Sequence, residues 1–163
     1  MTESPGTVVV LDDESKMLAA LQMRFEVRGW KVRTYSDAKS FAAAEFKLSD
    51  PIVVIMDHDL GGGVVGYEIV TQLRQARPDG LALPIVYLTG RESEKSYLEH
   101  RLKDPNLRPS CFISKNRLVH VDLLEICAAL LVHFQQTLEQ EQSQALRRAV
   151  AQVAMISPET EPF

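Results

Sequence analysis

The sequence PIVVIMD at residues 51–57 is a run of apolar residues that ends on a carboxylate, Asp57. Five successive apolar side chains suit a strand that is covered on both faces, as in a parallel sheet flanked by helices. Ligands bind such sheets beyond the carboxyl ends of their strands. Asp57 therefore lies where a functional site is expected, although a single aspartate at a strand end more commonly just begins a turn.

The same pattern of an apolar run that ends in polar residues recurs along the chain, and apolar residues at helical spacing lie between the runs. Strands are expected at residues 7–11, 30–35, 52–57, 83–89 and 111–114, and helices at 15–29, 36–44, 67–76, 91–102 and from about 121 onward. Right-handed crossovers turn this alternation into a parallel sheet with helices on both faces. The predicted fold is a doubly wound α/β domain with an extended C-terminal helix.

The composition is that of a soluble globular domain, since 45% of the 163 residues are apolar and 25% are charged. A net charge of −4 argues against direct binding to nucleic acid or to an anionic membrane. No signal peptide and no membrane-spanning run is recognisable, so a cytoplasmic location is expected. We expect one domain over residues 1–135 and a helical extension and tail over residues 136–163.

Polar residues at the expected strand ends form a coherent group: Asp12 and Asp13, Asp57, Thr89 and Lys115. Three crowded carboxylates repel one another unless a cation is present, and hard oxygen ligands suit Mg²⁺. A hydroxyl and an ammonium group supply the remaining donors for phosphoryl oxygens. The group predicts a phosphoryl-transfer site with Asp57 as the nucleophile, which forms an acyl phosphate.

These residues lie in motifs that resemble those of the response-regulator receiver family. The matching stretches are VLDDE at 10–14, VIMD at 54–57, GYE at 66–68, LPIVYLTG at 83–90 and FISK at 112–115. The resemblance covers roughly residues 6–134, and several motifs in the same order are more specific than any single one. It implies a flavodoxin-like, five-stranded parallel sheet of strand order 2-1-3-4-5.

The resemblance also implies roles for individual residues. By this comparison Asp57 is the phosphoacceptor, Thr89 the hydroxyl that moves on phosphorylation, Lys115 the phosphate-binding cation and Phe112 the switch aromatic. The implied Mg²⁺ ligands are the side chains of Asp12, Asp13 and Asp57 and the main-chain carbonyl of Asp59. The phosphoryl group would come from a histidine kinase or phosphotransfer protein. A downstream partner would bind the segment after Thr89, the strand of Phe112 and the last helix, so the chain would be a signalling receiver rather than an enzyme.

Two loops depart from the family pattern. Three glycines, at residues 61–63, follow the phosphoacceptor, and Gly66 comes one residue late; the family's Lys-Pro is replaced by Lys115-Asn116. We also expect Asp59 and Arg91 to face the entrance of the site. They either pair and set the lifetime of the phosphorylated state, or remain two solvated charges whose interaction is worth a few tenths of a kcal/mol.

The last helix carries a heptad repeat made of Leu124, Leu131, Leu138 and Ala145. Up to Leu131 this face is expected to pack against the sheet. Beyond it, Gln135 and Gln142 occupy seam positions, which favours a weak coiled coil or a solvated amphipathic helix about equally. We expect the extension to form a homodimer or to bind a partner.

Two other functions fit parts of the sequence. Residues 57–59, DHD, match the DxD motif of haloacid-dehalogenase-like phosphatases, but in those enzymes the nucleophile strand comes first, whereas here Asp12 and Asp13 precede it. The altered loops also allow a pseudo-receiver, a binding module that has lost phosphorylation. The chain is either a free-standing receiver or one end of a longer protein, and Met1 favours a native start.

Overall fold

The computed structural model describes residues 3–44, 52–61, 66–76, 83–90, 110–118 and 122–156. Strands and helices alternate through these residues, as predicted. The elements are β1 (Thr7–Leu11), α1 (Ser15–Glu26), β2 (Lys31–Tyr35), α2 (Ala38–Ala43), β3 (Ile52–Asp57), α3 (Gly66–Ala76), β4 (Ile85–Thr89), β5 (Ser110–Ser114), the 3₁₀ turn η4 (Lys115–Arg117) and α5 (Leu123–Ile156). The helix expected at 91–102 lies outside the described residues.

The five strands form one parallel sheet of order β2-β1-β3-β4-β5, which confirms the predicted topology. The register keeps the carboxyl ends of the strands nearly level. Leu11 is paired with Met56, Asp57 with Leu88, and Thr89 with Ser114. The residues that end the central strands, or follow them, therefore gather at a single edge of the sheet.

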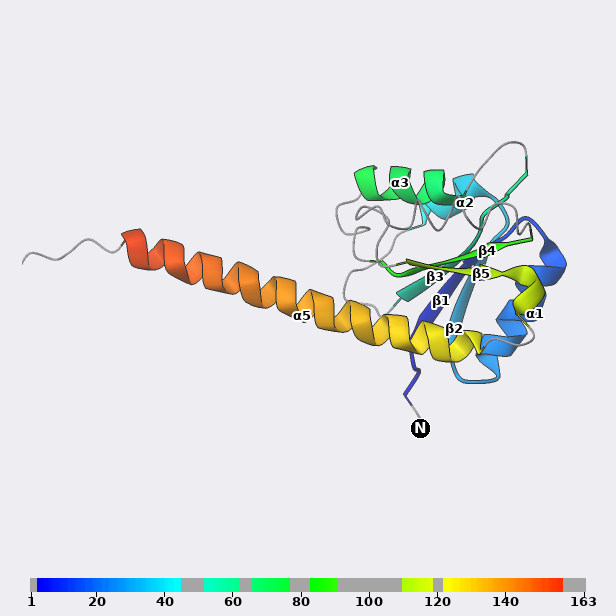
Figure 1. Cartoon of the computed structure of the whole chain (residues 1–163), viewed down its shortest axis with the longest axis horizontal. Coiled ribbons are helices and arrows are strands. Elements are labelled where there is room, and N and C mark those ends of the chain that lie inside the picture. Colours follow the sequence, from blue (N-terminus) through cyan, green and yellow to red (C-terminus); the bar gives the residue numbers. More distant parts are fainter. Residues whose placement is uncertain are drawn as a thin grey trace, which may run out of the picture.

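Helices cover both faces of this sheet, with α2 and α3 on one side and α1 and α5 on the other (Figure 1). Strand β3 supplies side chains to both layers because successive residues of a strand point to opposite faces. Val53 and Ile55 pack in the layer under α1 and α5, while Val54 and Met56 pack in the layer under α2 and α3. All four are fully buried, so β3 is the central strand that the PIVVIMD run predicts.

Helix α5 begins on the sheet and then projects away from it (Figure 1). Its first turns bury Leu123, Cys127, Leu131 and Phe134 against the core. Farther along, Leu146, Val150 and Val153 are exposed. The expected domain limit at 135/136 falls inside this continuous helix. None of the helices described here is both long enough and apolar enough to cross a membrane.

Candidate functional site

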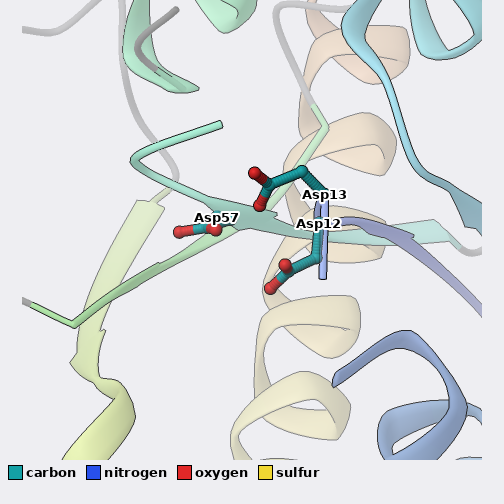
Figure 2. A group of neighbouring side chains, drawn as sticks. All are labelled: Asp12, Asp13 and Asp57. Atoms are coloured by element: carbon teal, nitrogen blue, oxygen red, sulfur yellow. The ribbon is translucent and has the colours of Figure 1, made fainter. Parts of the chain in front are cut away.

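Three carboxylates meet at the carboxyl edge of the sheet (Figure 2). Asp12 and Asp13 follow β1, and Asp57 ends β3. One oxygen from each of the three side chains lies within 4.8 Å of the others. Asp12 and Asp57 are buried, whereas Asp13 is exposed and so leaves the group open to solvent. The structure thus brings together the three acids that the sequence assigns to a metal site.

Lys115 lies between two of these acids. Its Nζ is 3.1 Å from Asp12 Oδ2 and 3.1 Å from Asp57 Oδ2. The lysine begins η4, in which the Leu118 N–H donates to the Lys115 carbonyl oxygen at 3.3 Å. This short turn, with Asn116 in place of the family's proline, still delivers the ammonium group to the acids.

The charges at this edge perturb one another. Burial, reinforced by the negative charge of Asp12, raises the pKa of Asp57 to about 6, against the lowering effect of Lys115. Burial alone would lower the pKa of Lys115, but its contacts with Asp57 and then Asp12 outweigh that effect and raise it. The lysine is therefore firmly cationic, and it only partly compensates the acids.

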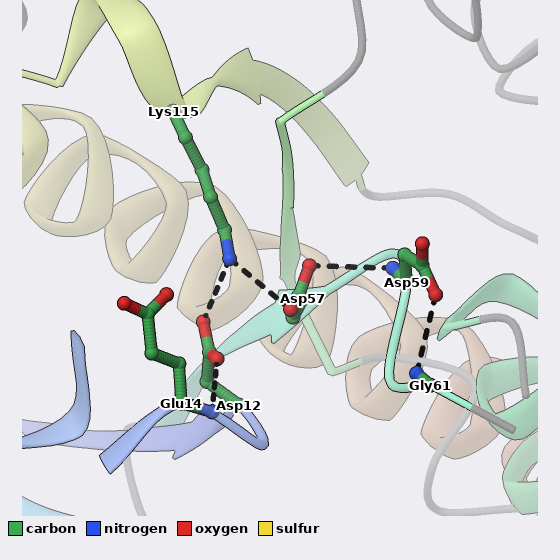
Figure 3. Close-up of polar contacts among 6 residues, drawn as sticks. All are labelled: Asp12, Glu14, Asp57, Asp59, Gly61 and Lys115. Carbon is green, nitrogen blue, oxygen red and sulfur yellow. Dashed lines mark hydrogen bonds and ion pairs between the residues drawn. The ribbon is translucent and has the colours of Figure 1, made fainter. Parts of the chain in front are cut away.

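Backbone N–H groups orient the acidic side chains (Figure 3). Asp12 Oδ1 accepts the N–H of Glu14 at 2.8 Å, and Asp57 Oδ1 accepts the N–H of Asp59 at 3.2 Å. Asp59 Oδ1 in turn accepts the N–H of Gly61 at 3.1 Å. Each bond joins an aspartate to the residue two positions later, the geometry of an Asx turn. Sequence reasoning missed this role of Gly61, although the spacing of Asp59 and Gly61 was a usable signal.

Gly66 holds the start of α3 against the end of β3. Its N–H donates to the His58 carbonyl oxygen at 2.8 Å. A Cβ at this position would lie 2.7 Å from the carbonyl oxygen of Asp57 and 3.2 Å from Met56 Cγ. The close approach requires glycine at position 66, although this glycine comes one residue late in the family pattern.

Of the other residues near the site, the structure describes some and leaves others outside the described part of the chain. Thr89 is buried at the end of β4, at the same edge as the acids. His58, the residue after Asp57, is 5% exposed, and its main-chain N–H donates to the Leu88 carbonyl oxygen at 2.7 Å, so it is part of the packed end of β3. The backbone of Phe112 pairs with that of Tyr87 in the sheet, but its side chain lies outside the described residues. Arg91 also lies outside them, so its pairing with Asp59 stays a prediction.

A family model described as the response regulator receiver domain matches residues 8–115 of this chain. The chain belongs to this family. A response regulator receiver is a module of two-component systems, and the matched range contains the acids, Thr89 and Lys115 of the site described above.

The receiver is similar to curated and structurally solved proteins. It is 37% identical over 84 residues to the C4-dicarboxylate transport transcriptional regulatory protein DctR of Rhodobacter capsulatus, a match that covers 52% of this chain and 41% of DctR. The chain therefore spans less than half of that relative. Two solved structures share its fold at 20% identity. For a receiver domain from Clostridium thermocellum the TM-score is 0.62, and the match covers 82% of this chain and 98% of the other. For full-length FixJ from B. japonicum the TM-score is 0.63, and the match covers 96% of this chain and 71% of FixJ.

The donor set at this edge fits the cation that the family implies. Asp12, Asp13 and Asp57 offer only carboxylate oxygens, with no sulfur or imidazole ligand among them. Oxygen-only sets suit hard cations such as Mg²⁺, which also keeps part of its water shell and so needs an open side. The exposure of Asp13 provides that open side.

Proposed function

We propose that this receiver takes a phosphoryl group onto Asp57 from a phosphohistidine of a histidine kinase or phosphotransfer protein, with Mg²⁺ as cofactor. The observation that carries the proposal is the position of the Asp57 carboxylate, which is buried at a strand end beside two further acids and one lysine. A carboxylate held in this way is set up for phosphoryl transfer rather than for a turn alone.

In the proposed step, a carboxylate oxygen of Asp57 attacks the phosphorus atom and an O–P bond forms. The P–N bond of the phosphohistidine breaks, and its electron pair stays on the imidazole nitrogen, which then takes a proton from solvent. With its pKa at about 6, Asp57 is mostly ionised, and so nucleophilic, at neutral pH. Lys115 lies 3.1 Å from Asp57 Oδ2, within reach of an added phosphoryl oxygen, and Thr89 supplies a hydroxyl.

Mg²⁺ would be held by the side chains of Asp12, Asp13 and Asp57 together with the main-chain carbonyl of Asp59. When bound, it would neutralise the crowded acids and the charge of the incoming phosphoryl group. Lys115 already performs part of this task for Asp12 and Asp57.

The phosphorylated state would be communicated through the hydroxyl and the aromatic of the switch. Thr89 would move toward the phosphoryl group, and Phe112 would follow inward. A downstream protein would then bind the segment after Thr89, strand β5 and helix α5 in one state better than in the other. In this proposal the chain is a cytoplasmic signalling receiver without direct nucleic-acid contact, and it supports only its own phosphorylation and dephosphorylation.

Intact-mass measurement after incubation with Mg²⁺ and a small acyl-phosphate donor tests the proposal. Wild-type protein should gain the mass of one phosphoryl group, and Asp57→Asn should gain none. Unlabelled wild-type protein would instead favour a pseudo-receiver. Repeated turnover of a generic phosphate ester would favour the phosphatase reading, because a receiver should be labelled only stoichiometrically.

We also propose a homodimer formed through the projecting part of α5. Leu146, Val150 and Val153 are 67%, 60% and 66% exposed and lie three or four residues apart, so they share one side of the helix. A second copy of α5 would remove this apolar side from water. Sedimentation of the full chain against a truncation before Gln136 should give a larger assembly for the full chain, and equal monomer masses would contradict the dimer.

A further inference from the structure

The chain after β3 folds back through two successive Asx turns (Figure 3). In the first, the Asp57 carboxylate accepts the N–H of Asp59; in the second, the Asp59 carboxylate accepts the N–H of Gly61. The ring closed by the second bond contains the main-chain carbonyl of Asp59. The bond therefore restricts the rotation of the carbonyl group that the proposed function assigns to Mg²⁺.

The second turn also brings Gly61 against the acidic group. Gly61 has φ +77°, in the left-handed region that favours glycine. A Cβ built on it would lie 3.3 Å from Asp13 Oδ2. The backbone of Gly61 is therefore a close neighbour of the exposed Asp13 carboxylate, and a side chain at position 61 would press on it.

We propose that Asp59 is a positioning residue for the metal-binding half of the site. By accepting the Gly61 N–H, its carboxylate fixes the segment that carries the Asp59 carbonyl and keeps Gly61 beside Asp13. The inference rests on the proposed function, because it gives Asp59 a part in holding Mg²⁺. This role differs from a charge pair with Arg91. In an Asp59→Asn variant, the side-chain amide oxygen can still accept the Gly61 N–H but cannot form an ion pair.

Replacing Asp59 in two ways separates the turn from the charge. Asp59→Ala removes the acceptor and should weaken Mg²⁺ binding by about tenfold, the usual size for loss of a group that orients metal ligands. Asp59→Asn keeps an acceptor oxygen, and loss of one exposed, screened charge should weaken binding by no more than about threefold. Calorimetry on the full chain measures both affinities. Equal weakening in the two variants, or wild-type affinity in both, would overturn the inference.

Two glycines provide a matched pair for the contact with Asp13. Gly29 has φ +82°, close to the value at Gly61, but a Cβ there would meet only Pro5 Cδ, at 3.9 Å. Gly61→Ala and Gly29→Ala should therefore strain the backbone alike, and only Gly61→Ala should weaken Mg²⁺ binding. The same Mg²⁺ affinity in both variants would contradict the role of Gly61. Circular dichroism verifies that both are folded.

A readout without metal separates failure of this inference from failure of the proposed function. In metal-free protein, amide exchange of Gly61 measured by NMR should be slower in wild type and Asp59→Asn than in Asp59→Ala. If wild type binds Mg²⁺ but the Gly61 amide exchanges equally in all three proteins, only the inference fails. If wild type binds no Mg²⁺, the proposed function fails, and the metal role of Asp59 fails with it.

Discussion

The carboxyl edge of the sheet and the part of α5 beyond Phe134 both hold side chains in an unfavourable environment, and the two environments are opposite. At the edge, Asp12 and Asp57 are 1% and 4% exposed, so charges are held away from water. On α5, Leu146, Val150 and Val153 leave apolar surface in water. The edge is stabilised in part from within, by Lys115, whereas the three side chains on α5 remain more than half exposed.

The contrast shows where binding is expected. A cation or a phosphoryl group would relieve the crowding of acids at the edge, and an apolar surface would cover the helix. Because the edge depends on compensating contacts inside the fold, substitutions there should change stability strongly. Substitutions on the exposed helix should change assembly while leaving the stability of the domain almost intact.

Among substitutions at the carboxyl edge, Lys115→Met should lower stability the most. Methionine keeps much of the side chain's apolar stem but removes the charge that Asp12 and Asp57 contact at 3.1 Å. Removing one partner of a buried ion pair should lower the free energy of unfolding by about 3 kcal/mol at neutral pH. Urea unfolding in metal-free buffer measures the change. A loss below about 1 kcal/mol, the range of a surface ion pair, would show that the edge is effectively solvated.

Asp57→Asn should act in the opposite direction and depend on pH. Because the folded-state pKa of Asp57 is raised to about 6, its protonation stabilises the fold at low pH, and this stability is lost as pH rises from the ordinary value of 3.8 through 6. The difference in free energy of unfolding between the variant and wild type should therefore be about 3 kcal/mol more favourable to the variant at pH 8 than at pH 3.5. Unfolding curves in chelator at the two pH values measure this. A pH-independent difference would mean that Asp57 is not perturbed.

Gly66→Ala should destabilise the junction of β3 and α3 by about 1–3 kcal/mol, because its Cβ would be too close to the Asp57 carbonyl oxygen. Gly90 is a matched control beside Thr89, since a Cβ there meets nothing within 4 Å. Thermal unfolding should show a loss for Gly66→Ala and little change for Gly90→Ala. Equal effects of the two substitutions would argue against the close approach at Gly66.

Leu146→Ser on the projecting helix should have the smallest effect on stability. The side chain is 67% exposed, so the free energy of unfolding should change by less than about 0.5 kcal/mol. On the same helix, Leu131→Ala should cost about 2–5 kcal/mol, because Leu131 is only 4% exposed. Urea unfolding of monomeric protein compares the two. Similar costs would mean that Leu146 is buried within the chain in solution.

Much of the fold could be predicted from local patterns. The alternation of apolar runs and helical stretches was enough to predict the parallel sheet, because β1, β3 and β4 are buried and a polar residue ends or follows each of them. The meeting of Asp12, Asp57 and Lys115 followed from the same rule, since strand ends share one edge in a parallel sheet. These features depend on periodicity and topology, which short stretches of sequence carry.

Other features depended on details that periodicity does not carry. The approach of Gly61 to Asp13 and of Gly66 to Asp57 arises from the path of one loop, and glycine alone does not indicate which neighbour it accommodates. The raised pKa of Asp57 depends on the balance between burial, the charge of Asp12 and the charge of Lys115, and this balance is set by the three-dimensional arrangement of the three side chains. The extension of α5 beyond the sheet was predicted, but the repeat of Leu131 and Ala145 does not determine whether its outer turns are covered.

The most direct test of the account is to locate the phosphoryl group. After labelling with a small acyl-phosphate donor and Mg²⁺, the acyl phosphate can be reduced with borohydride and the modified residue identified by peptide mass spectrometry. A single modified position, Asp57, is expected. Modification of Asp12 or Asp13 in place of Asp57 would contradict the assignment.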